Sequence, residues 1–89
     1  MLTLPRVLTH EIAADLSVGL KNSVQAAVGS VVSDASGLQL FDSSALAVLL
    51  ATRREALAAG KPFSVHGLPE RLQQLARLYG VAELFPASA

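Results

Sequence analysis

The stretch that decides the fold of this chain covers residues 34–60 and reads DASGLQLFDSSALAVLLATRREALAAG. It opens with turn residues at 34–37, directly after the apolar pair at 31–32. Asp42 and two serines then precede a continuous apolar run, which is typical of a helix N-terminus. The stretch therefore predicts a strand, a loop and a helix in succession, and the first amides of that helix lack intrahelical acceptors and are free to bind a polar group.

Helical patterns occur at three places in the chain. The helix after Asp42 is expected to cover residues 43–59, because Gly60 and Pro62 follow it and both residues favour a helix end. Residues 13–28 carry apolar side chains every three or four positions, which predicts an earlier one-sided helix. A third helix is expected to begin at Pro69, and its apolar stripe consists of Leu72, Leu75, Ala76 and Tyr79.

Short β-type segments alternate with these helices, at residues 5–10, 30–33 and 63–66. This order predicts an α/β fold, a single domain with a mixed sheet and helices packed against it. Right-handed crossovers would make the second and third segments parallel neighbours. Proline near the start of the first segment suits an edge strand, and residues 86–89 are expected to fray.

Composition excludes several functions. Apolar residues make up 52% of the 89-residue chain and charged residues only 16%, so some apolar surface is expected to meet a partner. Seven basic residues balance seven acidic ones, which argues against a nucleic-acid ligand. Cysteine is absent, which removes disulfides and thiolate chemistry.

The first residues show no secretory signal pattern, and the longest apolar run, 45–51, is far shorter than the roughly 20 residues that cross a bilayer. A cytosolic protein without direct membrane insertion is therefore expected.

Residues Asp42, Ser43 and Ser44 allow two interpretations. Asp and Ser are the usual caps of a helix N-terminus, so all three residues can have a purely structural role. Alternatively, one of the serines accepts a phosphate, which would sit at the favourable end of the helix dipole. The residues alone do not decide between the two.

Catalysis and metal binding find no support in the sequence. His10 and His66 lack partners at metal-ligand spacing, and no base can be assigned to either serine. The glycines are scattered singly, whereas phosphate-cradling loops need them clustered. We therefore expect neither an enzyme nor a bound cofactor or metal.

The helix at 43–59 is apolar well beyond one stripe. Four leucines, Leu46, Leu49, Leu50 and Leu57, are expected to face the core, and small apolar residues widen the apolar surface around the helix. Arg53 and Arg54 lie at its edge. The helix is either wedged between the sheet and a neighbouring helix, or it offers a face of small residues to a partner protein.

These motifs resemble the signature of STAS domains, in which a D-x-S turn leads to a D-[ST]-[SAT]-[GA]-L helix start. The matching positions are Asp34, Ser36, Asp42, Ser43, Ser44, Ala45 and Leu46, with Ala45 standing where glycine is usual. Residues 68–80 are similar to the last helix of the MlaB branch of this family. The likeness covers nearly the whole chain.

The resemblance implies one of two roles. MlaB-like proteins are non-catalytic subunits that bind the cytosolic MlaF-type ATPase of a phospholipid ABC transporter, which maintains outer-membrane lipid asymmetry from the inner membrane. Anti-sigma-factor antagonists instead are phosphorylated on the second serine, here Ser44. The short chain and residues 76–79 favour the first role, and the expected partner-binding residues are Asp42, Ser43, Ser44, Ala45, Val48 and Arg53.

Overall fold

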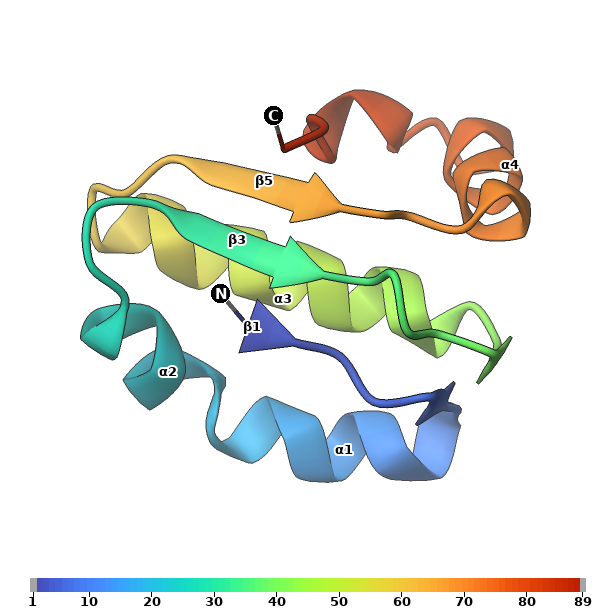
Figure 1. Cartoon of the computed structure of the whole chain (residues 1–89), viewed down its shortest axis with the longest axis horizontal. Coiled ribbons are helices and arrows are strands. Elements are labelled where there is room, and N and C mark those ends of the chain that lie inside the picture. The colour runs from blue at the N-terminus through green and yellow to red at the C-terminus, as the bar shows by residue number, and fades with distance from the viewer. Residues whose placement is uncertain (1, 89) are drawn as a thin grey trace.

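The computed structural model describes residues 2–88 of the chain (Figure 1). Its elements, in chain order, are β1 (Leu2–Thr3), β2 (Val7–Leu8), α1 (His10–Val18), α2 (Leu20–Ala26), β3 (Val31–Asp34), β4 (Leu40–Phe41), α3 (Ser44–Ala58), β5 (Phe63–His66), α4 (Glu70–Leu78) and the 3₁₀ helix η1 (Ala82–Leu84).

The strands form two parallel sheets. The larger has the order β1-β3-β5, with Val31 opposite Phe63 and Leu2 opposite Ser33, and the smaller pairs β2 with β4. The α/β class and the parallel pairing of β3 with β5 are therefore confirmed. Every ladder within residues 2–88 is parallel, whereas a mixed sheet was expected. The strands of the larger sheet are parallel because each connection between them carries a helix, and no tight hairpin turn reverses the chain.

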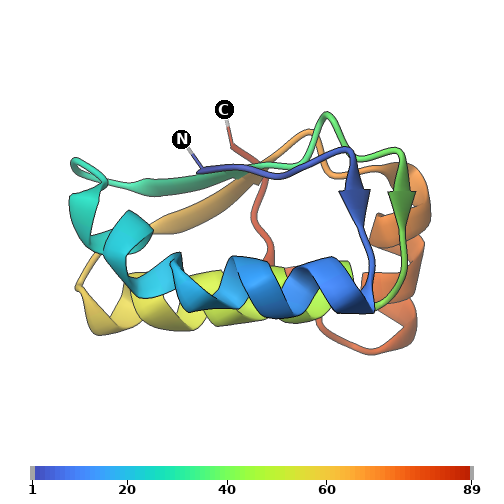
Figure 2. The ribbon, with the colours of Figure 1, turned by 90° about the horizontal axis from the view of Figure 1, so that it is seen from below.

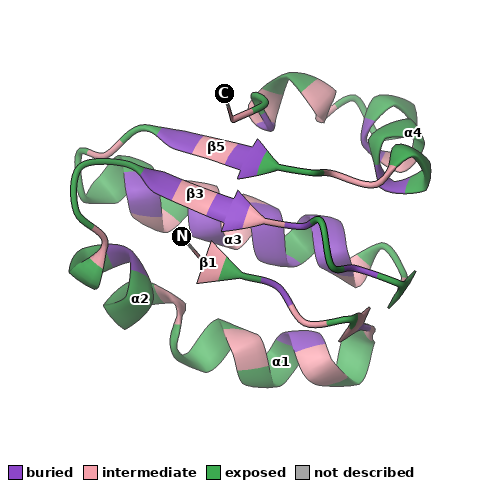
Figure 3. Ribbon diagram, viewed as in Figure 1, coloured by how far each residue is buried: buried purple, intermediate pink, exposed green. Residues whose placement is uncertain are grey.

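Helices α1, α2 and α3 lie on the same side of the larger sheet (Figures 1 and 2). The core between these layers is marked by the buried segments of Figure 3, and its largest fully buried side chains include Leu8, Val24, Val31 and Leu49. The opposite side of the sheet carries no helix in the described chain. Strands β3 and β5 accordingly alternate between buried residues toward the helices and partly or fully exposed residues on the helix-free face.

The firmest sequence predictions concern α3 and β5. The predicted helix at 43–59 is confirmed as Ser44–Ala58, and the predicted strand at 63–66 is confirmed with the same bounds. Gly60, which follows the C-cap residue Ala59, has a φ of 71°, the left-handed conformation that helix ends favour. Leu57 was expected in the core but is 53% exposed, because it lies on the side of α3 that faces away from the sheet.

The predicted helix at 13–28 is wrong in extent. It begins three residues earlier, at His10, and divides at Gly19, whose φ of −97° and ψ of 0° leave the helical region. The second piece ends at Ala26, so Val28 is 97% exposed outside the helix rather than part of its apolar stripe.

Both chain ends differ from expectation. Of the predicted segment at 5–10, only Val7–Leu8 forms a strand, β2, and His10 belongs to α1. Strand β1 lies before Pro5, outside the predicted segment. Residues 86–88, expected to fray, are hydrogen-bonded to β5: Val65 donates its amide to Pro86, and Ser88 donates its amide to Val65, at 2.8 and 2.9 Å. Ala89 lies outside the described residues.

A lysine ties α2 to the segment between α3 and β5. The Nζ atom of Lys61 donates hydrogen bonds to the carbonyl oxygens of Val24, Gln25 and Ala27, at 2.8, 3.1 and 2.5 Å. These carbonyls lie at the C-terminus of α2, where the helix dipole attracts a cation; that of Val24 also accepts from the amide of Ala27 at 3.2 Å. One side chain thereby uses its three donors to hold a seven-residue helix against the chain that enters β5.

The turns after β3 and β5 touch at Gly67. Its φ is 67°, and a Cβ atom built on it would lie 2.6 Å from the Cβ of Ser36 and 2.9 Å from the Cα of the same residue. Only glycine allows this approach, and the amide of Ala35 donates to the carbonyl of His66 at 2.8 Å beside it. The 34–37 turn is therefore held in place by the turn after β5.

Replacing Gly67 tests this contact. Gly67→Ala should lower the free energy of unfolding by about 2–3 kcal/mol, because it combines a left-handed backbone with a clash against the backbone of Ser36. Gly60→Ala is the matched control: its φ is similar, yet nothing lies within 4 Å of the added Cβ, so the loss should be about 1 kcal/mol. Urea unfolding measures both variants. Equal losses would show that the approach to Ser36 contributes nothing.

Candidate functional site

One carboxylate organises the start of α3. Asp42 accepts a hydrogen bond on Oδ1 from the amide of Ser44 at 2.8 Å, and on Oδ2 from the amide of His10 at 3.2 Å. Ser44 is the first residue of α3 and His10 is the first residue of α1, so both amides lack intrahelical acceptors. Asp42 therefore caps two helices that are 32 residues apart in sequence.

These contacts also explain the acidity of Asp42. The pKa of this carboxyl lies below its ordinary value of 3.8, first because the amide of Ser44 donates to the charged form, with a smaller contribution from His10. The carboxylate is exposed, and its ionised state is the one that caps the two helices. The cap interpretation of Asp42 is thus what the geometry shows.

The two serines differ in their surroundings. Ser43 is exposed, has helical dihedral angles at the N-cap position, and makes no side-chain capping bond to the helix. Ser44 is half-buried and its amide is taken by Asp42. Ser43 is therefore the residue of this pair that presents its side chain outward.

The other predicted partner-binding residues do not share one exposed surface. Ala45 and Val48 are 0% and 2% exposed, so their side chains belong to the core and not to the outer face of α3. Arg53 is half-buried. The exposed residues on the same helical side as Ser43 are Ala47, Arg54, Leu57 and Ala58, whereas Leu50 is half-buried and packs against the core. We call the exposed residues, together with Ser43, the α3 outer face.

The first half of the signature, the 34–37 turn, is a separate polar structure. Asp34 accepts hydrogen bonds on Oδ1 from the hydroxyl of Ser36 at 2.6 Å and from the amide of the same residue at 3.0 Å. The hydroxyl contact is the main reason why the pKa of Asp34 is lowered, followed by the amide contact and, more weakly, the nearby His66. This is a turn that closes on itself rather than a group of catalytic side chains.

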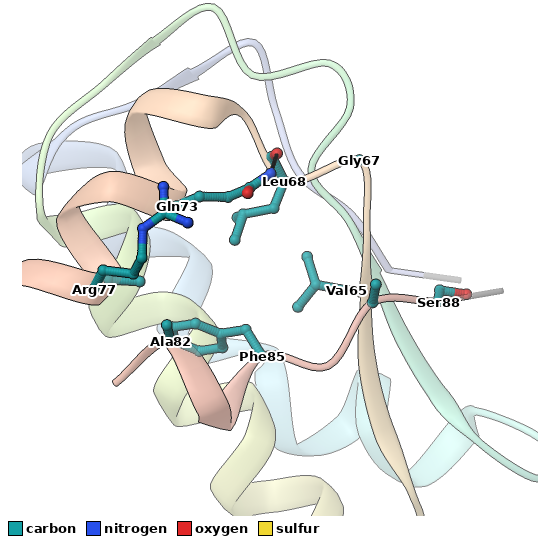
Figure 4. A pocket seen from close by; sticks show the side chains of 10 residues that line it. Val65, Gly67, Leu68, Gln73, Arg77, Ala82, Phe85 and Ser88 are labelled. Atoms are coloured by element: carbon teal, nitrogen blue, oxygen red, sulfur yellow. Dashed lines mark hydrogen bonds between the residues drawn. The ribbon is translucent and has the colours of Figure 1, made fainter. Parts of the chain in front are cut away.

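A hollow of about 340 Å³ lies between β5, α4 and η1 (Figure 4). Val65, Leu68 and Phe85 form apolar walls, and Arg77 and Gln73 lie along the side made by α4. The amide nitrogen of Gln73 donates to the carbonyl of Leu68 at 2.8 Å. The hollow thus combines an apolar lining with one cation.

Two residues with buried hydroxyl groups were not predicted from the sequence. Ser33 and Thr52 are 1% and 2% exposed, in the middle of β3 and of α3. Ser33 stands where the alternation of the strand points inward, and Thr52 stands four positions after Val48 on the buried side of its helix. A polar residue at an inward position of an apolar pattern was the signal that could have found them.

We call the Asp42 carboxylate, which caps both α1 and α3, the double cap. The fold and the double cap define a class of small α/β domains with parallel strands, a capped helix start and an apolar helix face open to solvent. Within that class, the family model described as "Mlab, STAS domain" matches residues 1–86, so the chain belongs to this STAS family. A comparison with curated proteins found no match. Within residues 2–88, no helix is long and apolar enough to cross a membrane.

The double cap can be tested through stability. Asp42→Ala removes both acceptors and should lower the melting temperature by about 4–8 °C, the usual effect of losing a cap in a domain of this size. Asp42→Asn keeps one acceptor oxygen and should lose less. Thermal unfolding followed by circular dichroism measures both variants, and an unchanged melting temperature in Asp42→Ala would contradict the cap.

The pH dependence has a defined sign. The folded protein lowers the pKa of Asp42, so this carboxylate adds stability above the ordinary pKa of 3.8, and that stability is lost as the pH falls through the lower folded value. The difference in melting temperature between wild type and Asp42→Asn should therefore be largest near neutral pH and shrink in acid. Asp34 titrates in both proteins and cancels from this difference.

Proposed function

We propose that this protein is a non-catalytic subunit that binds an MlaF-type ATPase of a phospholipid ABC transporter and thereby helps to maintain outer-membrane lipid asymmetry. Membership of the MlaB-type STAS family supports this role. The observation that carries it is the α3 outer face, on which Ala47, Leu57 and Ala58 are exposed beside Arg54.

The composition of the α3 outer face suits a protein partner. Leu57 is 53% exposed and Ala47 is exposed, whereas Arg54 supplies a charge among these apolar side chains. Apolar side chains with an interspersed arginine are typical of protein interfaces, and the small Ala47 and the free Ser43 allow close backbone approach. Ala45 and Val48 serve this surface indirectly, since their burial fixes the helix on the sheet.

The mechanism would be mechanical rather than chemical. A subunit that docks more tightly on one state of the ATPase shifts the ATPase toward that state, by no more than the difference between the two affinities. The start of α3, which Asp42 fixes, suits such a role because docking there requires little further ordering of the domain and so loses little conformational entropy. The protein would then lie in the cytoplasm, attached to the inner membrane through the transporter.

The alternative is a phosphorylation switch at Ser44. A phosphate there would compete with Asp42 for the amides at the start of α3 and would repel the Asp42 carboxylate. Because Asp42 also holds the first amide of α1, phosphorylation would loosen both helix starts. This observation gives the switch a physical route, and the experiments below separate the two roles.

The docking surface can be tested with a charged substitution. Ser43→Arg should reduce capture of the purified ATPase at least tenfold, because a long charged side chain would stand where the partner approaches, while the melting temperature stays within about 2 °C of wild type. Ser30→Arg, at an exposed site after α2, is the matched control and should bind normally. Wild-type binding by Ser43→Arg would place the interface elsewhere.

The choice between transport and switch rests on the state of Ser44 in cells. Intact mass of the protein from its native cells should show no phosphate, and deletion of the gene should make the cells sensitive to detergent. Ser44→Ala and Ser44→Asp should both complement the deletion. Stoichiometric phosphorylation, with opposite effects of these two variants and no membrane defect, would assign the switch instead.

The purified chain should hydrolyse neither ATP nor a generic ester, because neither a phosphate-cradling loop nor a serine with an assigned base is present in its sequence. Steady-state assays with both substrates measure this. Turnover that disappears in Ser43→Ala or Ser44→Ala would contradict the non-catalytic role.

A further inference from the structure

Helix α2 lies at the end of the helical layer, beside the last turns of α3 (Figures 1 and 2). Of its seven residues, Val24 is buried, Leu20 is half-buried and the other five are exposed. Isolated helices of fewer than about 12 residues are marginal in water, so a helix this short depends on the contacts that hold it against the domain. Among the side chains of α2, only that of Val24 is fully covered by the core.

The sequence gives α2 little support of its own. Its N-cap makes no side-chain hydrogen bond, and its first turn carries Lys21 but no acidic residue, which the helix dipole disfavours. Gly19 precedes the helix, and Gly29, with a φ of 79°, follows it; a Cβ built on either glycine would have no atom beyond the adjacent residues within 4 Å. The segment is thus bounded by two glycines in open surroundings, which can absorb the backbone changes that a hinge requires.

The packing around α2 is incomplete. A hollow of about 410 Å³ lies along one side of it, where Leu20 and Ser23 form part of the lining together with residues of β1 and α1. Another, of about 260 Å³, lies between α2 and α3 and is lined in part by Val24, Glu55 and Ala59. Protein interiors are close-packed and contain few such spaces. Helix α2 therefore meets the domain over less than a full helix face.

The main polar attachment of α2 comes from outside the helix. Lys61, between α3 and β5, donates hydrogen bonds to the carbonyls of Val24, Gln25 and Ala27, at 2.8, 3.1 and 2.5 Å. Bonds from a charged donor are stronger than neutral ones, and these three exist only while α2 lies beside the end of α3. Lys61 therefore stabilises the docked position of α2.

We propose that α2 is a lid that swings away from the last turns of α3 about Gly19 and Gly29 while the rest of the domain stays folded, and that Lys61 holds this lid closed. Opening exposes Val24 and the side of α3 around Ala59, next to Ala58 of the α3 outer face. The open form thus presents more apolar surface on α3 than the closed form. The inference does not depend on the ATPase interaction proposed above.

Labelling of a buried cysteine measures the opening, because the chain has no cysteine of its own. In the full chain, Val24→Cys should react with DTNB at a rate that hardly changes with urea below the unfolding transition, because local opening exposes little surface. Val31→Cys, at a position of β3 that is 0% exposed, should react about tenfold more slowly or less, and with the full urea dependence of unfolding. Equal rates with equal urea dependence at the two positions would overturn the proposal.

Two further substitutions separate opening of the lid from unfolding of the domain. Lys61→Met keeps the aliphatic stem but removes three hydrogen bonds, so it should speed labelling at position 24 about tenfold or more. Gly67→Ala is expected to destabilise the whole domain from the opposite end of the strands (Figure 1). It should speed labelling at position 31 and leave labelling at position 24 unchanged. Acceleration at both positions by Gly67→Ala would show that α2 opens only when the domain unfolds, and would reject the lid.

Lys21→Met is the matched control for Lys61→Met, because it removes an exposed charge from α2 itself and should not speed labelling. Amide hydrogen exchange of the chain without added cysteine gives a second measure that does not require Val24→Cys to fold. The amides of residues 23–26 should be less protected than those of β3, with a weak urea dependence, and Lys61→Met should lower their protection further. If Lys61→Met changes neither labelling nor exchange of α2, Lys61 does not hold the lid and the proposal is wrong.

Discussion

The contact on which the rest of the structure depends is the pair of hydrogen bonds that the Asp42 carboxylate accepts from His10 and Ser44. The small ladder of β2 and β4 brings these segments together, since each helix begins within two or three residues of one of its strands. With both N-termini fixed at one point, α1 and α3 run side by side along the same face of the larger sheet (Figure 2). The direction of the helical layer is thus set by a single charged group.

Two surfaces of α3 follow from this arrangement, and they explain its unusual composition. One side packs against the sheet through Ala45, Leu49 and Ala56, each at most 1% exposed. The helices α1 and α2 pack along a second side of α3, and the side that remains keeps Ala47, Leu57 and Ala58 in solvent. Under the proposed function, this solvent-facing side is the one that meets the partner.

The sequence predicted local structure where the signals were local. Strand β5 and the end of α3 were found because a β-type segment, a glycine and a proline mark them within a few residues. The start of α1 was missed because it depends on an acceptor 32 residues away, which no local pattern reveals. The burial of Ala45 and Val48 was missed because α3 is apolar around most of its circumference, so periodicity could not select the inward side.

The site predictions followed the same rule. The general preference for Asp before a helix predicted Asp42 as the cap of α3, but that preference does not indicate that Asp42 also caps α1. Ser33 was not singled out from the sequence because a serine in a strand usually finds a hydrogen-bond partner nearby. Only the three-dimensional packing shows that its Oγ has none among the described residues. Contacts of this kind join residues that are far apart in sequence, so a sequence that predicts the fold can still leave the contacts of the site unpredicted.

The edges of the larger sheet give little opportunity for strand addition. One edge is β1, only two residues long, and the other is closed over β5 by the bridge between Val65 and Ala87. Aggregation by strand addition needs a long, flat row of unpaired backbone groups, and neither edge provides one. The exposed apolar residues of this chain, which is 52% apolar, lie mostly on helices and loops, where they cannot template a growing sheet.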